Sequence, residues 1–155
     1  MQGTSIRPED KSNHAAWGVP VAFVHPGDQA AGEPDLAARD RVVSWFAPTF
    51  GYVHAATFNL IETGTGGGPT LVNIRNVTLA VDLFAAGNRP SLAQAGANTP
   101  GRQSLAAAVM QNRDFNAGDE ITLDVDAVAT AAAGLQVTLW VVLGKRAADT
   151  DLPGT

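Results

Sequence analysis

The three histidines, His14, His25 and His54, carry the side chains best suited to metal binding or proton transfer. A zinc site or an acid–base pair requires two such groups that converge on one point, each oriented by a partner. No two of these histidines stand two or four residues apart, which is the spacing of a ligand pair on one element. His25 lies at an expected turn and His54 in an expected strand. We therefore expect no histidine-based active site.

Nucleophilic and phosphate-binding motifs are also missing. A serine nucleophile needs a sharp elbow such as G-x-S-x-G, which surrounds none of Ser44, Ser91 and Ser104. The glycine-rich segment 64–70 lacks the lysine of a phosphate loop, and Pro69 removes an amide donor. We interpret this segment as a hairpin-like connection between strands, and we predict that the protein is not an enzyme.

Acidic residues are densest in the segment 119–126. Asp124 and Asp126 are two residues apart on an expected strand, so both project from the same face. A calcium ion could be held there with carbonyl groups from a neighbouring loop. The simpler interpretation, which we prefer, is the solvent face of a strand whose Leu123 and Val125 point inward. We predict no metal and no cofactor.

Aromatic side chains are the remaining candidates for binding. Exposed aromatic rings on a β-sandwich can stack on sugars, because the apolar face of a pyranose lies flat against a ring. Trp17 and Tyr52 are therefore candidate contacts to a glycan or a partner chain. Trp45 and Trp140 lie within apolar runs, which favours a place in the core or in a subunit interface.

Residues 85–103 are rich in Gly, Asn and Pro and form the longest expected loop. A loop of this length is unusual in a compact domain and indicates a contact role. Asn88 and Arg89 are its candidate partner or glycan contacts.

The elements that must position these residues are strands. Large apolar residues alternate with smaller or polar ones, with turn residues at roughly even spacing. The expected strands are 17–25, 41–46, 50–61, 71–74, 77–83, 104–110, 121–126 and 135–143. Pro20 cannot donate a ladder hydrogen bond, so the first strand should lie at a sheet edge.

About eight short strands without a convincing amphipathic helix predict an all-β fold, a jelly-roll-like antiparallel β-sandwich. Residues 1–16 are polar and show no period, and we interpret them as an extended N-terminal arm. The β-sandwich domain should cover residues 17–146, and residues 147–155 should form a polar C-terminal tail.

The composition of the chain argues against some classes of partner. The chain has 155 residues, of which 45% are hydrophobic and only 16% charged, and its net charge is −5. A nucleic-acid groove needs clustered positive charge, so we expect no nucleic-acid partner. The longest apolar run near the C-terminus, 135–143, is far shorter than a membrane span, so we expect no membrane association. The low charged fraction indicates that partner chains cover part of the surface.

The segment 42–146 resembles the jelly-roll domain of spike and fibre proteins of tailed phages and gene transfer agents. The resemblance lies in the aromatic–Gly strand 50–58, in the short strand 70–74 and in the closing strand 134–139. It lies also in the segment 115–126, which matches the F-x-x-G-D-x-I-x-x-x-V pattern of these domains. The resemblance covers about two-thirds of the chain and lies in the succession of strands and turns, not in a diagnostic motif. The family's spike proteins usually carry a longer N-terminal attachment region than the roughly 40 residues that precede the match here.

The resemblance implies a homotrimer on the outer surface of a capsid or tail. The partners would be the major capsid protein or other virion subunits and, in some members, host surface polysaccharide. We therefore expect a structural protein that decorates or cements a capsid, or forms a spike or fibre subunit. The alternative is a carbohydrate-binding β-sandwich module that recognises host surface glycans.

Overall fold

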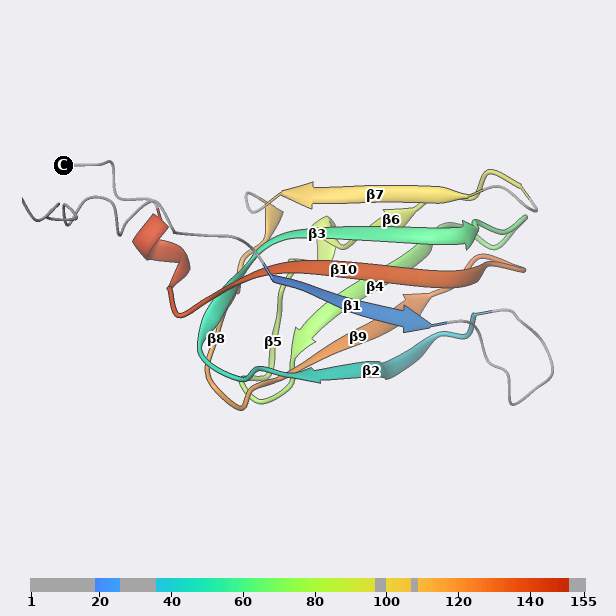
Figure 1. Cartoon of the computed structure of the whole chain (residues 1–155). Coiled ribbons are helices and arrows are strands. Elements are labelled where there is room, and N and C mark those ends of the chain that lie inside the picture. Colours follow the sequence, from blue (N-terminus) through green and yellow to red (C-terminus); the bar gives the residue numbers. More distant parts are fainter. Residues whose placement is uncertain (1–18, 26–35, 97–99, 107–108, 151–155) are drawn as a thin grey trace, which may run out of the picture.

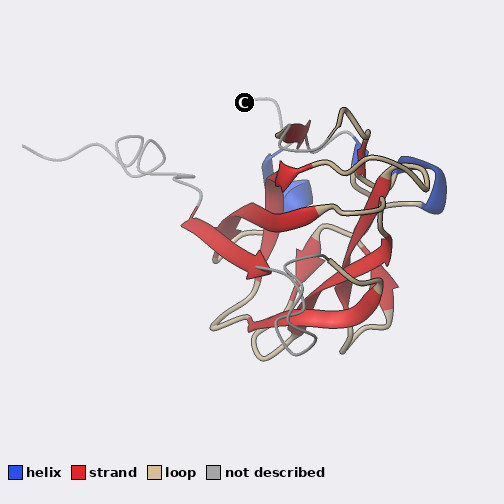
Figure 2. Cartoon of the chain, turned by 90° about the vertical axis from the view of Figure 1, so that its right-hand side faces the viewer, coloured by secondary structure: helices blue, strands red, loops and turns tan. Residues whose placement is uncertain are grey.

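The chain folds as a sandwich of two antiparallel β-sheets (Figures 1 and 2), as the strand pattern predicted. The computed structural model describes residues 19–25, 36–96, 100–106 and 109–150. The expected arm 1–16 lies outside the described residues, as do residues 151–155 of the expected tail 147–155. In the described part, no helix is both long and apolar enough to cross a membrane.

Two short 3-10 helices, η3 (Ala86–Asn88) and η5 (Ala147–Thr150), accompany the strands. The strands are β1 (Val19–His25), β2 (Arg39–Phe46), β3 (Gly51–Glu62), β4 (Thr70–Asn76), β5 (Val81–Asp82), β6 (Ser91–Leu92), β7 (Gly101–Ala106), β8 (Asp114–Phe115), β9 (Glu120–Ala127) and β10 (Ala133–Leu143).

Sheet A has the strand order β1-β10-β3-β7, with β8 also paired to β3. Sheet B has the order β2-β9-β4-β5, with β6 also paired to β4. When the eight strands on these two paths are counted along the chain, the orders become 1-8-3-6 and 2-7-4-5. This is the order of a jelly roll, in which a long antiparallel ribbon is wrapped into two facing sheets.

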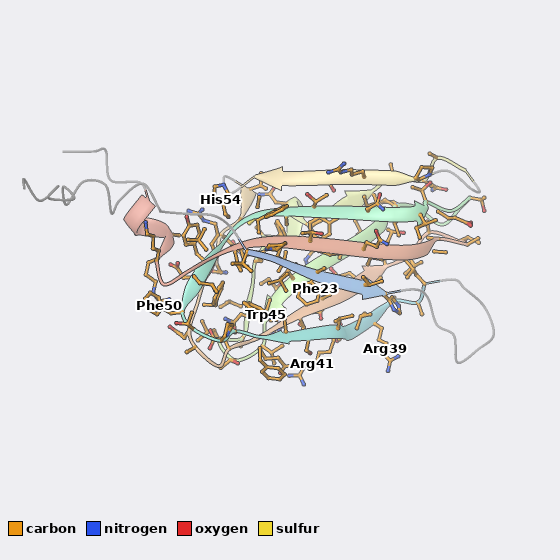
Figure 3. All side chains as sticks on the ribbon, in the orientation of Figure 1. Phe23, Arg39, Arg41, Trp45, Phe50 and His54 are labelled. Carbon is orange, nitrogen blue, oxygen red and sulfur yellow. The ribbon has the colours of Figure 1, made fainter. Side chains whose placement is uncertain are left out.

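The core lies between the sheets and comes from the inward positions of the alternating strands. On β1, Phe23 is 1% exposed, whereas Val24 beside it is 56% exposed. Among the described strands β1 pairs with β10 alone and lies at the end of the strand order, so it is an edge strand there, and Pro20 lies on it as the sequence predicted. Trp45 is half-buried on the inner side of β2, with its ring edge-on to Phe115 at 5.5 Å (Figure 3).

The prediction of a strand at 77–83 was wrong. Residues 77–80 form a turn, and only Val81 and Asp82 pair with β4. The Asn76 side chain accepts a hydrogen bond from the Leu79 amide at 3.0 Å, and Ala80 has a φ of 56°. This local side-chain bond replaces the ladder bonds that the alternating pattern predicted, and Leu79 is left 45% exposed.

The same turn is connected to the F-x-x-G-D segment. Asp119 is 3% exposed, and its Oδ2 accepts hydrogen bonds from the Asn116 amide at 2.8 Å and from Asn76 Nδ2 at 2.7 Å. A buried carboxylate with these donors fixes two turns at one end of sheet B. Its role is therefore structural.

The segment 63–69 is not a hairpin, because β3 and β4 belong to different sheets. Instead it crosses from sheet A to sheet B and bridges to two other segments, with Gly64 opposite Gly96 and Gly66 opposite Thr130. Gly64 has a φ of 85°, and a Cβ there would lie 2.5 Å from the Thr130 carbonyl oxygen. The glycines therefore allow a close crossing of backbones.

Candidate functional site

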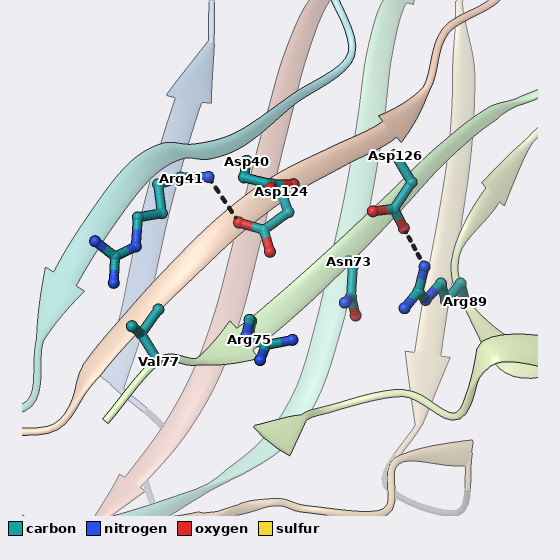
Figure 4. A pocket seen from close by; sticks show the side chains of 8 residues that line it. All are labelled: Asp40, Arg41, Asn73, Arg75, Val77, Arg89, Asp124 and Asp126. Carbon is teal, nitrogen blue, oxygen red and sulfur yellow. Dashed lines mark hydrogen bonds and ion pairs between the residues drawn. The ribbon is translucent and has the colours of Figure 1, made fainter. Parts of the chain in front are cut away.

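A polar hollow of about 620 Å³ lies on the outer face of sheet B (Figure 4). Its side chains come from three strands and the two loops that follow β4 and η3, and nearly all are polar or charged. The lining residues are Asp40, Arg41, Asn73, Arg75, Val77, Arg89, Asp124 and Asp126. We call this set the polar hollow.

One wall of the hollow is formed by an irregularity in β2. Arg39 pairs with Val125 and Val43 with Leu123, so β2 uses two more residues than β9 over this span. The bulge contains Arg41, whose φ of 52° is left-handed and uncommon for a residue with a long side chain. Backbone strain of this kind persists only where surrounding contacts hold it.

The contact that holds Arg41 is a hydrogen bond from its amide to Asp124 Oδ1 at 2.8 Å. Asp124 Oδ1 also accepts a hydrogen bond from Thr122 Oγ1 at 3.1 Å. Asp124 is therefore only 5% exposed, and the expectation of a solvated strand face was wrong at this residue. No donor among the described residues reaches its second oxygen, Oδ2. Leu123 and Val125 do face the core, as predicted.

The opposite wall is a chain of four alternating charges. Arg89 donates to Asp126 Oδ2 at 2.8 Å and to Asp82 Oδ2 at 3.1 Å, and Arg75 donates to Asp82 Oδ1 at 3.0 Å. Burial raises the pKa of the Asp126 carboxyl above its ordinary value, Arg89 lowers it, and nearby Asp124 raises it further. The pairs join β4, β5, β9 and the loop after η3.

The loop expected at 85–103 is tied to sheet B, and this positions Arg89. Pro90 accepts a hydrogen bond from the Val72 amide at 3.1 Å, and β6 pairs with Thr70 and Leu71 of β4. Arg89 follows η3 directly and enters the hollow, whereas Asn88 is exposed on η3 outside the set that lines it.

The outer face of sheet A has a different character. Three rows of residues cross β1, β10 and β3 by register: Pro20–Trp140–Ala55, Ala22–Thr138–Thr57 and Val24–Gln136–Asn59. None of these nine residues carries a charge. Trp140 is 41% exposed and Val24 56%. We call these nine residues the uncharged face.

The other candidate residues from the sequence that the structure describes do not lie together at one site. Trp17 lies outside the described residues. Tyr52 is 2% exposed and packs with Val142 and Ala147, so its ring is inside the molecule. His54 is exposed with its ring near that of Tyr52, and His25 lies about 20 Å away at the far end of sheet A. Among the described residues, no three His, Asp or Glu side chains form a group that could hold a metal ion.

Of the three candidate contacts that the structure describes, Arg89 lines the polar hollow, whereas Tyr52 and Asn88 do not. Sequence reasoning missed Asn73 and Arg75, which alternate with the buried Val72 and Ile74 on β4. That alternation was available as a signal for Asn73, which lies within the expected strand 71–74, whereas Arg75 lies just beyond its expected end.

No protein-family model matches the chain. No curated protein matches it either.

Proposed function

We propose that this chain is a non-enzymatic structural subunit on the outside of a phage or phage-like particle, where it packs against neighbouring copies. The observation that carries the proposal is the uncharged face, which spans three paired strands of sheet A. Interface cores are depleted in charged residues and enriched in aromatic ones, and Trp140 lies in the middle strand of this face.

The uncharged face can be covered by another subunit with little loss of hydration free energy. Burying an unpaired charge requires its desolvation, whereas Thr138, Ala22 and Val24 lose little when another sheet or loop packs on them. Exposed tryptophan gains most from such contact, since large aromatic side chains often dominate interface energies. Other subunits can therefore cover this face at low cost.

The jelly-roll strand order and the F-x-x-G-D segment support the assignment to the spike, fibre and decoration class. That resemblance implies a homotrimer, with the major capsid protein or other virion subunits as further partners. The arm 1–16 would reach a neighbouring subunit, and its deletion should leave the sandwich folded while abolishing attachment to particles.

The direct test is the mass of the purified protein by light scattering at several concentrations. We expect a stable species with three times the mass of the 16.0 kDa chain. Particles purified from the source organism should contain the protein, as seen by mass spectrometry and by antibody labelling of intact particles. A monomer at every concentration, together with absence from particles, would overturn the proposal.

A carbohydrate-binding module is the second candidate function. The polar hollow favours it, because this surface presents hydrogen-bonding groups from several elements on the face opposite to the proposed interface.

A further inference from the structure

Two buried polar side-chain atoms in the described part of the chain have no hydrogen-bond partner, Asn73 Oδ1 and Arg89 Nε. Both side chains line the polar hollow. Asn73 is 2% exposed and lies on β4 directly opposite Asp124 of β9. Buried polar groups are nearly always paired, and an unpaired one lowers stability by about 1–3 kcal/mol. None of the described residues supplies a partner for either atom.

The two atoms have complementary requirements. Asn73 Oδ1 is an acceptor that needs a donor, and Arg89 Nε is a donor that needs an acceptor. Asp124 Oδ2 is a second acceptor, since only the Oδ1 atom of this carboxylate is bonded to Arg41 and Thr122. Figure 4 shows Asn73, Arg89 and Asp124 on the same side of the β9 and β4 ribbons. A group that both donates and accepts fits this arrangement best.

The charges that line the hollow indicate which class of ligand it can bind. Three arginines and three aspartates line the hollow, so the lining has no net charge. A phosphate or carboxylate would meet Asp124 and Asp126, and a divalent cation would meet Arg75 and Arg89. A neutral ligand avoids both repulsions.

We propose that the polar hollow binds a neutral saccharide through its hydroxyl groups. A hydroxyl is a neutral group that both donates and accepts, and a sugar carries several at fixed spacing. The volume of about 620 Å³ lies within the usual range of small-molecule sites. No aromatic residue lines the hollow, so recognition rests on hydrogen bonds to Asn73, Arg89 and Asp124.

Access to the two buried atoms needs only side-chain movement. The terminal torsion of Asn73 is soft, so its amide can turn its oxygen towards a hydroxyl donor. The Arg75 side chain is 41% exposed and can move aside. The Arg89 side chain is 28% exposed and can turn its Nε–H towards the ligand while it stays in the hollow. The site does not depend on assembly, because it lies on the face opposite to the uncharged face.

The test is an NMR titration of the isotope-labelled full-length protein with neutral sugars: glucose, galactose, rhamnose, N-acetylglucosamine and oligomers of each. Concentrations up to about 50 mM detect millimolar binding. We expect at least one sugar to shift the Asn73 side-chain amide and the Arg89 Nε–H signals in a saturable manner. Sodium sulfate and calcium chloride, titrated in parallel at constant ionic strength, should not.

Two matched substitutions test whether the Nε–H group of Arg89 binds the sugar. Arg89→Lys keeps the positive charge beside Asp82 and Asp126 but removes the Nε donor, and it should weaken sugar binding about tenfold or more. Arg102→Lys, the same change at an exposed residue of sheet A, should leave affinity unchanged. Spectra without sugar report whether each variant is folded.

Three outcomes would overturn the proposal. The first is that no sugar shifts the two signals, which would mean that water satisfies both atoms. The second is a saturable response to sulfate or calcium alone, which would identify an ion site. The third is equal sugar affinity for a folded Arg89→Lys variant and the wild type. A monomeric protein that still binds sugar would instead contradict the assembly proposal and leave this one standing.

Discussion

The outer faces of the two sheets present different side chains, although both sheets are antiparallel. On sheet A, the nine residues of the uncharged face use no charge and expose Trp140 and Val24. On sheet B, side chains at comparable outward positions are charged, hydrogen-bonded across strands and partly buried. A face of the first kind can be covered at low cost, whereas the second face holds its polar groups in place and leaves two of them, Asn73 Oδ1 and Arg89 Nε, without a partner. The difference indicates that sheet A is suited to packing and sheet B to recognition.

The largest effect should come from placing a charge on the uncharged face. Trp140→Glu should raise the dissociation constant of the proposed trimer about 30-fold or more, since an unpaired buried charge costs several kcal/mol. Leu79→Glu is the matched control, because Leu79 is similarly exposed, at 45% against 41%, but lies on the turn between β4 and β5. Light scattering of both variants measures the effect. Equal masses for the two would remove the distinction between the faces.

The next effect concerns the buried carboxylate of sheet B. Asp124→Ala should lower the free energy of unfolding by about 2–3 kcal/mol, because the Arg41 amide loses its acceptor and the Thr122 hydroxyl keeps only its longer contact, 3.5 Å to the Arg75 carbonyl oxygen. Thr138→Ala, at a central position of sheet A, should cost less than about 0.5 kcal/mol. Urea denaturation of each variant gives these values. Asp124→Asn, which retains an acceptor oxygen, should recover most of the loss.

A smaller effect is expected for the row of four alternating charges on sheet B. Asp82→Asn removes the carboxylate between Arg75 and Arg89 and should cost about 1 kcal/mol at low salt. The loss should shrink in about 0.5 M NaCl, because these groups are partly exposed and salt screens them. Arg102→Gln on sheet A should show no such salt dependence. A loss that persists undiminished in salt would indicate packing rather than charge.

The smallest effect should be a pH dependence at Asp126. Its pKa is raised in the folded state, chiefly by burial, so the protonated form is favoured by folding. The stabilisation is full below the ordinary value of 3.8 and is lost as pH rises through the folded-state pKa. The melting temperature of the wild type minus that of Asp126→Asn should therefore fall over this window. A difference that rises with pH would mean that Arg89 dominates the carboxyl's environment.

The sequence was sufficient to predict the sandwich because alternation reports burial directly. Leu123 and Val125 of β9 and Phe23 of β1 face inward as their spacing predicted. The same rule failed at 77–83, where alternation was present but the Asn76 side chain formed a turn. A local hydrogen bond determines the structure of this segment, and the pattern of apolar residues does not predict such a bond.

The polar hollow could not have been predicted in the same way. It depends on the bulge at Arg41 and on the pairing of β4 with β9, whose residues are about 50 positions apart along the chain. The ion pair between Arg89 and Asp126 likewise joins residues 37 positions apart. Arg89 was singled out from its loop alone, without its partner. Such sites arise from strand register, which a single sequence specifies only weakly.

The position of β10 between β1 and β3 has a consequence for synthesis of the chain on the ribosome. His25 pairs with Leu135, which is 110 residues further along. At about 5–20 residues per second, β1 is made roughly 5–20 s before its only partner strand. Until then, Phe23 has no β10 to pack beside, and Pro20 limits the edge-to-edge pairing of β1 with other nascent chains. Sheet A can therefore close only after β10 has been made, and a ribosome that stalls before residue 133 leaves β1 and β3 without the strand that joins them.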